Sequence, residues 1–240
     1  MASIIVNRFK VRVPYPFGVV AFWVSVLVKW FGLLRGGWSQ RVVEYPWVLR
    51  QLRVFVPRGA RVLDVGCSES VLSHVLLYMG YEVWGLDIND YPYKPRQMVF
   101  VKRDVRDTGL PSNFFDAIVV VSTIEHIGLP VYGQVGFDVD GDIKAIGKLR
   151  RILKPGGYLI ITTPFAGREF RIVPGERQYD IERLRLLERG FEVVAEDFFI
   201  SYKLGRRVVW VRIGRDFAGK VLTRPEAPGL VCLVLRKPLS

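Results

Sequence analysis

An acidic residue inside a strongly apolar strand is the feature that most limits how this chain can fold. Residues 61–65 form that strand, Asp64 lies within it, and Gly66 follows directly. A buried carboxylate without a partner is costly, so Asp64 is expected to serve a site. A second apolar stretch, residues 82–87, ends in Asp87, 23 residues after Asp64. In parallel α/β sheets an acid at that place can accept hydrogen bonds from both hydroxyls of a ribose, while the first turn brings backbone N–H groups near the ligand.

The turn after the first strand indicates which nucleotide the site suits. Dinucleotide enzymes place G-x-G-x-x-G here, because a pyrophosphate needs close approach of the backbone. In this chain the three positions are Gly66, Ser68 and Val71, so two of the three glycines are missing. A ligand with a ribose and an adenine but no phosphate, S-adenosylmethionine (SAM), fits these residues better. An ordinary βαβ unit with an incidental acid is the alternative at this point.

The rest of the pattern predicts a sheet of mostly parallel strands. Residues 114–122 are nearly all apolar, which is typical of a parallel strand covered on both faces. Strand 98–102 is followed by Asp104, which is suited to the adenine amino group. The expected strands are 61–65, 82–87, 98–102, 116–121, 157–163, 191–200 and 230–236, with 207–213 as a further strand outside the common core. The expected helices are 47–55, with Pro46 in its first turn, 69–79, 140–153 and 180–189.

This ordered set of motifs, which includes a Pro-Gly-Gly turn at residues 155–157, resembles the class I SAM-dependent methyltransferases over roughly residues 42–200. The resemblance implies an α/β, Rossmann-like fold with a mostly parallel seven-stranded sheet, one antiparallel strand, and SAM as the cofactor. It divides the chain into a basic and apolar N-terminal extension, residues 1–41, and a methyltransferase domain, residues 42–240. The chain departs from the family at residues 68–70, where Ser-Glu-Ser replaces the usual Gly-rich turn.

Within the superfamily, one group of small bacterial and archaeal methyltransferases shows the closer resemblance. Its members share a run like Ser-Thr-Ile-Glu-His-Ile-Gly-Leu at residues 122–129, followed by Tyr-Gly at 132–133 and Gly-Asp at 141–142. They also tend to carry a basic residue shortly before a Tyr-Asp pair, as in Arg-Gln-Tyr-Asp at 177–180. By this resemblance the chain is expected to act near the synthesis of cell-surface glycans or glycolipids.

The predicted cofactor contacts follow the first three strands and the end of the fourth. They are Asp64, Gly66, Cys67, Ser68, Ser70, Asp87, Ile88, Asp104, Val105 and Ser122.

Catalysis is expected at the residues after the fourth strand, which point towards the methyl group in this fold. His126 and Glu125 are the candidates there, and the pKa range of a histidine suits a general base. The alternative is that His126 orients its loop, while His74, inside the first helix after the nucleotide turn, is expected to pack. No metal site is expected, because the chain has only two histidines, and no x₂-spaced Cys pair suggests zinc.

The same motif restricts the acceptor. Enzymes that methylate the amino groups of nucleic-acid bases typically have Asn/Asp-Pro-Pro-aromatic after the fourth strand, whereas this chain has Ser-Thr-Ile-Glu at 122–125. Base N-methylation is therefore disfavoured. Arg168, Arg171 and Arg177 follow the fifth strand, and they are expected either to meet an anionic acceptor or to form a solvated basic loop.

The positive charge is concentrated at the two ends of the chain. Residues 1–60 hold nine Lys or Arg and one acid, a net of +8; residues 61–199 hold 17 and 20, a net of −3; residues 200–240 hold nine and two, a net of +7. Basic ends of this kind suit a nucleic acid or an anionic membrane. Thermal adaptation or solubility is the alternative explanation.

An apolar segment at residues 17–34, interrupted only by Ser25 and Lys29, favours the membrane. As a helix it would reach ~27 Å, barely the hydrocarbon thickness. Three interpretations stay open: a helix lying in the interface, a short spanning helix, or a helix packed on the domain or on a second subunit. The expected location is the cytoplasm, with attachment to the cytoplasmic membrane face as a possibility.

Three functions are consistent with these residues. The first is SAM-dependent O-methylation of a small, glycan or lipid-linked acceptor. The second is methylation of RNA at a ribose or an end, for which the basic ends argue. The third is a non-catalytic SAM-fold protein that docks a partner at a membrane.

Overall fold

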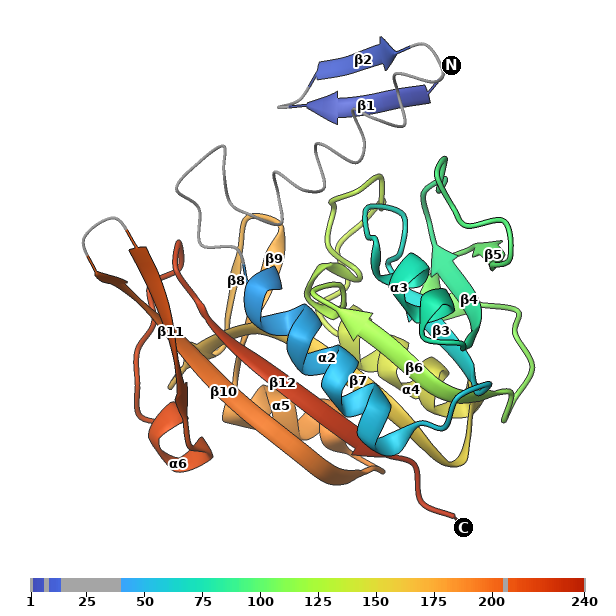
Figure 1. The fold of residues 1–240 in the computed structure, drawn as a ribbon. Coiled ribbons are helices and arrows are strands. Elements are labelled where there is room, and N and C mark those ends of the chain that lie inside the picture. The colour runs from blue at the N-terminus through green and yellow to red at the C-terminus, as the bar shows by residue number, and fades with distance from the viewer. Residues whose placement is uncertain (1, 7–8, 14–39, 205–206, 240) are drawn as a thin grey trace.

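Eight strands that follow one another in a single sheet form the middle of the protein (Figure 1). The computed structural model describes residues 2–6, 9–13, 40–204 and 207–239. Across the sheet the order is β11 (Arg207–Ile213), β10 (Glu192–Leu204), β12 (Gly229–Arg236), β7 (Leu153–Gly167), β6 (Phe115–Val121), β3 (Arg61–Val65), β4 (Glu82–Asp87) and β5 (Val99–Lys102).

The strand directions match the predicted mostly parallel sheet. Strands β3 to β7 pair in parallel, and β12 runs antiparallel to both β7 and β10. Strand β6 lies between β3 and β7, and it is buried along nearly its whole length, which explains its apolar sequence. The predicted Rossmann-like fold is confirmed, and β11 adds the expected further strand at the edge.

Helices cover both faces of the sheet. Helices α2 (Arg41–Phe55) and α3 (Leu72–Tyr78) pack with one buried apolar cluster. Helices α4 (Gly141–Ile152) and α5 (Ile181–Glu188) pack with the cluster on the other face. The short helices η1 (Val105–Asp107), η2 (Ile124–His126) and α6 (Arg215–Ala218) connect these elements. The result is a three-layer α/β/α arrangement (Figure 1).

Helix α2 begins earlier than the sequence predicts. The expected start was residue 47, just after Pro46, but the helix starts at Arg41 and contains the proline. Pro46 cannot donate to the carbonyl four residues before it, that of Val42. Val42 is 55% exposed, so water can hydrate this carbonyl. The extra turn matters because it places Arg41 and Glu44 beside the pocket described below.

The segment after β7 forms a hairpin where a basic loop was one of the expectations. Strands β8 (Arg171–Val173) and β9 (Glu176–Asp180) pair antiparallel, and β9 also pairs with the end of β7. Strand β9 is buried at its three middle residues. This hairpin therefore belongs to the packed domain.

The N-terminal residues that the structure describes form a second, smaller sheet. Strands β1 (Ala2–Val6) and β2 (Phe9–Val13) pair antiparallel as a hairpin. The apolar segment 17–34 lies outside the described residues. Within the described part of the chain, no helix is both long and apolar enough to cross a membrane.

Truncation of a central side chain of β12 tests the predicted packing. Leu233 is fully buried in the cluster under α4 and α5, so Leu233→Ala should lower the free energy of unfolding by about 2–5 kcal/mol. Leu239→Ala is the matched control, because Leu239 is 72% exposed and should change stability by less than about 0.5 kcal/mol. Urea unfolding measures both. Equal losses in the two variants would contradict the antiparallel placement of β12 inside the sheet.

Candidate active site

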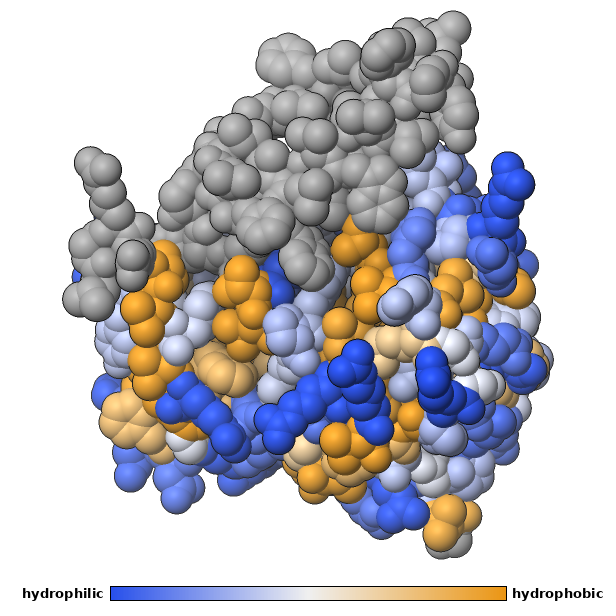
Figure 2. Space-filling view, viewed as in Figure 1, coloured by the Kyte–Doolittle hydropathy of each residue, from blue (hydrophilic) through white to orange (hydrophobic). Residues whose placement is uncertain are grey.

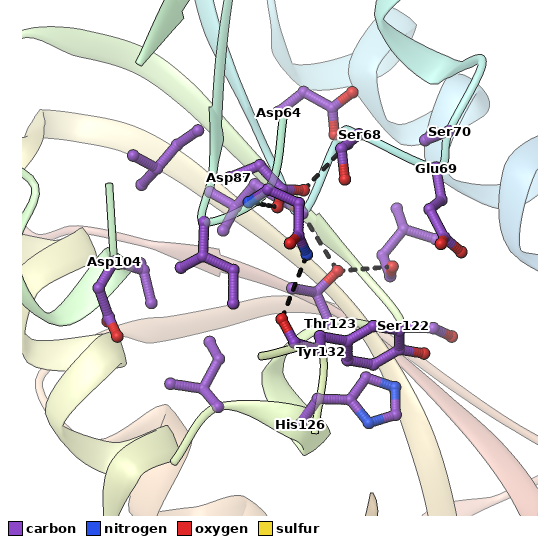
Figure 3. A pocket seen from close by; sticks show the side chains of 18 of the residues that line it. Asp64, Ser68, Glu69, Ser70, Asp87, Asp104, Ser122, Thr123, His126 and Tyr132 are labelled. Atoms are coloured by element: carbon purple, nitrogen blue, oxygen red, sulfur yellow. Dashed lines mark hydrogen bonds between the residues drawn. The ribbon is translucent and has the colours of Figure 1, made fainter. Parts of the chain in front are cut away.

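A cavity opens at the carboxyl ends of β3, β4 and β6 (Figure 3). Its empty space, counted together with the solvent at its open mouth, is about 920 Å³. Parallel strands end at the same edge of a sheet, so residues that follow different strands meet here. Of the predicted cofactor residues, all except Cys67 line this cavity.

The turn after β3 is shaped by Gly66. Its φ of +75° is in the left-handed region, and a Cβ there would lie 2.3 Å from Thr123 Oγ1. A side chain would therefore be both strained and in collision with the turn after β6. Gly66 N donates to Leu86 O at 2.9 Å, which ties the turn to β4. Only glycine suits this place, and the cavity floor depends on it.

Asp87 closes the turn from the end of β4. Its two carboxylate oxygens accept the backbone N–H groups of Ser68, at 2.9 Å, and of Asn89, at 2.8 Å. These bonds hold the carboxylate at the cavity wall. Each oxygen keeps a lone pair for a further donor, as a ribose diol requires.

Asp64 supports the site from below. It is 2% exposed, and Ser73 Oγ donates to Asp64 Oδ2 at 2.6 Å. Burial raises the pKa of Asp64 to about 7. Cys67, next to this turn, has a fully buried side chain, and a Cβ on Gly85 would lie 2.7 Å from its sulfur. Cys67 was predicted as a cofactor contact, and the structure places its thiol in the core and not at the cavity wall.

Asp104 lies at the end of β5, with Ile88 and Val105 also lining the cavity. Arg106 donates two hydrogen bonds to the Asp104 carboxylate, from Nε at 3.0 Å and from Nη2 at 2.6 Å. This bidentate bond lowers the pKa of Asp104 and keeps it charged. Asp104 thus stays an acceptor, as an amino group of adenine would need.

Ser122 stands at the end of β6 in a left-handed conformation, with φ of +42°. Its hydroxyl donates to Glu44 Oε1 of α2, and Thr162 Oγ1 donates to the same oxygen at 2.6 Å. Glu44 is fully buried, and Arg41 Nη1 pairs with its other oxygen at 3.1 Å. Three elements therefore meet around one carboxylate, which holds Ser122 at the cavity.

Arg41 is a site residue that the sequence analysis missed. Its guanidinium lines the cavity, donates to Val121 O at 3.3 Å, and is one of two cations among the described lining residues, with Arg103. A cation at the cavity wall suits the carboxylate of an amino-acid ligand. The signal was weak, because Arg41 was placed in the N-terminal extension. Its spacing of three from Glu44 was the available clue.

His126 lines the cavity. Its Nδ1 lies 2.6 Å from Gly175 O of the β8–β9 hairpin, and since a carbonyl only accepts, Nδ1 carries the proton. Nε2 is then a lone-pair acceptor. Burial lowers the pKa of His126, so the ring is neutral at pH 7. The ring packs edge-on against Tyr132, with centroids 5.1 Å apart (Figure 3).

Glu125, predicted as a catalytic residue, is not among the residues that line the cavity, and the structure places it behind the cavity wall. It is 1% exposed, and Thr163 Oγ1 donates to its Oε2 at 3.2 Å. Its Oε1 lies 3.8 Å from His126 Nε2, beyond hydrogen-bond distance. Burial raises the pKa of Glu125 well above its ordinary range. The side chain is a supporting group behind the histidine.

The three arginines after β7 do not form an anion site. Arg177 is fully buried and bonds backbone carbonyls, and Arg171 bonds Gln178 Oε1, at 2.6 Å, and Thr223 Oγ1, at 2.9 Å. Arg168 is exposed and reaches Lys220 O at 3.4 Å. Two of the three are thus used within the fold. Among the described residues, no group of His, Cys, Asp and Glu could hold a metal ion.

The fold and this cavity define a Rossmann-like protein that binds a nucleoside at the ends of its parallel strands. The model of the methyltransferase domain family matches residues 40–196, and the chain belongs to this family. The prediction of a class I SAM-dependent methyltransferase, with SAM as cofactor, is confirmed.

Curated relatives add a reaction type. The chain is 26% identical over 119 residues to the ubiquinone biosynthesis O-methyltransferase of Cereibacter sphaeroides, covering 44% of this chain and 41% of that protein. It is 31% identical over 121 residues to the enzyme of the same name from Xanthomonas campestris, covering 46% and 45%. The matched region thus spans less than half the length of these relatives.

Solved structures share the fold at low identity. The 1,6-didemethyltoxoflavin-N1-methyltransferase of Burkholderia thailandensis is 18% identical, with a TM-score of 0.59 and coverage of 95% of this chain and 92% of that one. The [4+2]-cyclase SpnF is 19% identical, with a TM-score of 0.58 and coverage of 86% and 84%. Since a cyclase shares the fold, the fold alone does not define the reaction.

Removal of the Asp87 carboxylate tests the ribose contact. Asp87→Ala should abolish SAM binding measured by calorimetry, because the diol would lose its acceptor and the turn at Ser68 would lose its anchor. Asp90→Ala is the control, since Asp90 is exposed and pairs with Lys102 at 2.8 Å on the surface. If Asp87→Ala binds SAM as tightly as Asp90→Ala does, the ribose assignment is wrong.

Proposed function

We propose that this protein is an O-methyltransferase in which His126 accepts the proton of the acceptor hydroxyl. The observation that carries the proposal is the Nδ1 contact with Gly175 O, which leaves Nε2 unprotonated on a residue that lines the cavity. A neutral imidazole with a lowered pKa is a competent base at neutral pH. The O-methyltransferase relatives support the same reaction type.

The reaction is an in-line displacement at the SAM methyl group. The acceptor oxygen forms a bond to the methyl carbon as the carbon–sulfur bond breaks, and the bonding pair stays on sulfur, which becomes a neutral thioether. The hydroxyl proton passes to Nε2 of His126. The protein's residues therefore have two tasks, to align the acceptor with the methyl group and to receive one proton.

The charge of the cavity argues against a polyanionic acceptor. Among the described residues that line it, the acids are Asp64, Glu69, Asp87 and Asp104, against the cations Arg41 and Arg103. RNA would bring phosphates towards an acidic cavity, which is unfavourable. A neutral hydroxyl on a small, glycan or lipid-linked acceptor fits better.

An apolar stretch at the mouth of the cavity supports a lipid-linked acceptor. Tyr132 lines the cavity and is 54% exposed, and beyond it Val135 is 97% and Phe137 is 63% exposed. Exposed apolar side chains next to a binding site are typical of contact with an apolar partner. Figure 2 shows hydrophobic and hydrophilic side chains interspersed over the face that carries α2, where Val54 and Arg53 are both exposed. Such a mixture is ordinary for a protein surface, so the support for an apolar partner comes from the residues at the cavity mouth.

Loss of the imidazole tests the proposed base. His126→Ala should lower kcat by about 10²–10⁴-fold. In the wild type, kcat should fall as the pH drops through a pKa below 6.5, because protonation of Nε2 removes the lone pair. His74→Ala is the control, since His74 does not line the cavity. The assay measures methyl transfer from labelled SAM to fractions of glycolipid, RNA and protein. Near-wild-type turnover in His126→Ala would leave His126 with a structural role.

Deletion of residues 1–38 tests our proposal that the N-terminal end attaches the protein to an anionic membrane. The deleted part contains the apolar segment 17–34 and much of the +8 charge of the N-terminal end. Each well-placed cation is worth ~1 kcal/mol at an anionic surface, in addition to apolar burial. The full chain should co-sediment with anionic liposomes, the deletion variant should not, and salt should only weaken the attachment. A full-length protein that stays free of liposomes contradicts the proposal.

A further inference from the structure

The loop between His126 and α4 forms one wall of the cavity. We call residues 127–139 the mouth loop; its Tyr132 and Gln134 line the cavity. Gln134 Oε1 accepts Gly128 N at 2.8 Å, and Gln134 Nε2 donates to His126 O at 2.9 Å. The loop is thus bound to the backbone of the histidine. Its position controls where the imidazole ring lies.

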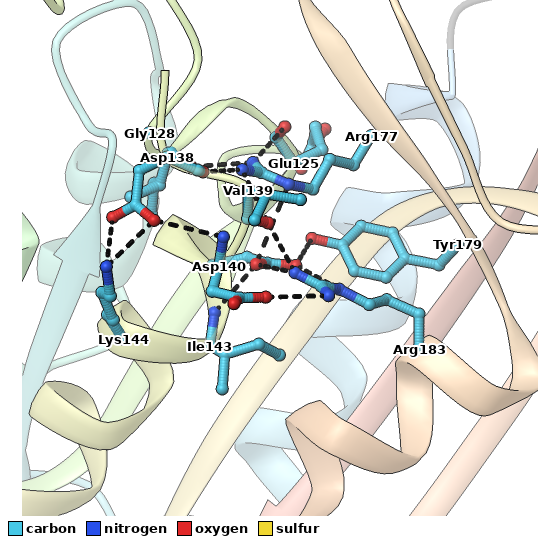
Figure 4. A network of polar contacts seen from close by, with 12 residues as sticks. Glu125, Gly128, Asp138, Val139, Asp140, Ile143, Lys144, Arg177, Tyr179 and Arg183 are labelled. Atoms are coloured by element: carbon cyan, nitrogen blue, oxygen red, sulfur yellow. Dashed lines mark hydrogen bonds and ion pairs between the residues drawn. The ribbon is translucent and has the colours of Figure 1, made fainter. Parts of the chain in front are cut away.

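A single buried side chain from another part of the chain joins both ends of the mouth loop. Arg177 of β9 donates through Nη1 to Ile127 O at 2.7 Å and through Nη2 to Asp138 O at 2.6 Å (Figure 4). Longer contacts of 3.3 Å reach Glu125 O and Val139 O. The planar guanidinium therefore bridges the carbonyls at the start and the end of the loop.

The charge of Arg177 is balanced without solvent. Arg177 Nε lies 3.8 Å from Asp142 Oδ1, and both side chains are fully buried. Asp142 also accepts Arg183 Nη2, at 2.6 Å, and Tyr179 Oη, at 3.0 Å. Arg177 Nε itself makes no hydrogen bond within the described part of the chain, so the pair is held by charge, and breaking one side of a buried ion pair is costly. This network holds Arg177 in one orientation.

The same hairpin also holds the histidine ring. The carbonyl of Gly175, two residues before Arg177, accepts a hydrogen bond from His126 Nδ1–H. Arg177 bonds the carbonyls of Glu125 and Ile127, which flank His126 in the sequence. The turn of the hairpin thus fixes the ring, and β9 fixes the backbone on both sides of it.

We propose that Arg177 is a positioning residue: by closing the mouth loop against β9, it keeps His126 on Gly175 O in the tautomer that leaves Nε2 free. This inference rests on the proposed function of His126. Arg177 touches neither the cavity nor a reacting atom, so it acts through the histidine. A basic side chain in this place is thus used for loop closure and not for anion binding.

Several charged or titratable groups face His126 and influence the direction in which its pKa should change in an Arg177 variant. They are Arg41 of α2, Glu125 of η2, Tyr132 of the mouth loop, and Glu176 and Arg177 of β9. Burial is the main cause of the lowered pKa of His126, and the positive charge of Arg177 acts in the same direction. Loosening the loop admits water, which raises the pKa of His126, whereas loss of the hydrogen bond to Gly175 O lowers it. Burial is the larger of the two causes, so the pKa should rise towards its ordinary value of about 6.5.

Nitrogen NMR of the histidine side chains tests the proposal without knowledge of the acceptor. The full chain has two histidines, so ¹⁵N-histidine labelling gives two rings to assign, with His74→Gln identifying that of His126. In the wild type, His126 should be protonated at Nδ1 and should titrate below pH 6.5. Arg177→Lys, which lacks the fork needed to bridge both ends, should give mixed tautomers and a higher pKa. Arg177→Met should do so more strongly.

Arg171→Lys is the matched control, because Arg171 lies on the facing strand and bonds Gln178 and Thr223 instead of the mouth loop. It should leave the His126 spectrum and titration unchanged. Circular dichroism checks folding, and if Arg177→Met does not fold, Arg177→Lys decides. The proposal is overturned if wild-type His126 carries its neutral-form proton on Nε2, or if the folded Arg177 variants titrate as the wild type does. The proposed function fails by a different measurement. Normal turnover of His126→Ala would refute the proposed function and leave the NMR result intact.

Discussion

The parallel pairing of β3 with β4 and β6 is the constraint on which the rest of the structure depends. It brings three strand ends to one edge, so Gly66, Asp87 and Ser122 can surround a single cavity. The fit is tight, since a Cβ on Gly66 would collide with Thr123 at the end of β6. A shift of the pairing register of one strand by one residue would turn the side chains of that strand to the opposite face of the sheet.

Buried polar groups then hold the cavity walls from outside the central strands. Glu44 of α2 accepts hydrogen bonds from the hydroxyls of Ser122 and Thr162. The guanidinium of Arg177, on β9, donates hydrogen bonds to four backbone carbonyls. Each of these two buried charges has an opposite partner, Arg41 for Glu44 and Asp142 for Arg177. A buried charge left unpaired would destabilise the fold, so these contacts are tied to folding as well as to the site.

Much of the fold and part of the site were predictable from local patterns. The strands at β3, β4 and β6 show continuous apolar runs, and Gly66 and Asp87 mark the ends of two of them. The start of α2 was missed because Pro46 looked like a first-turn residue, although an exposed carbonyl at Val42 permits it inside the helix. The sequence did not show that His126 lines the cavity and Glu125 does not, because adjacent residues after a strand point in different directions and periodicity does not tell which one faces the cavity.

By itself the sequence determined the class of fold, the cofactor and the edge of the sheet where the chemistry lies. These follow from short-range patterns of apolar residues, turns and strand-end acids. Only the tertiary structure decided that Arg41 reaches the cavity, that Cys67 faces the core, and that Arg177 closes a loop. The physical reason is that these roles depend on contacts between segments far apart in the chain. A buried arginine and a solvated one have the same sequence signature.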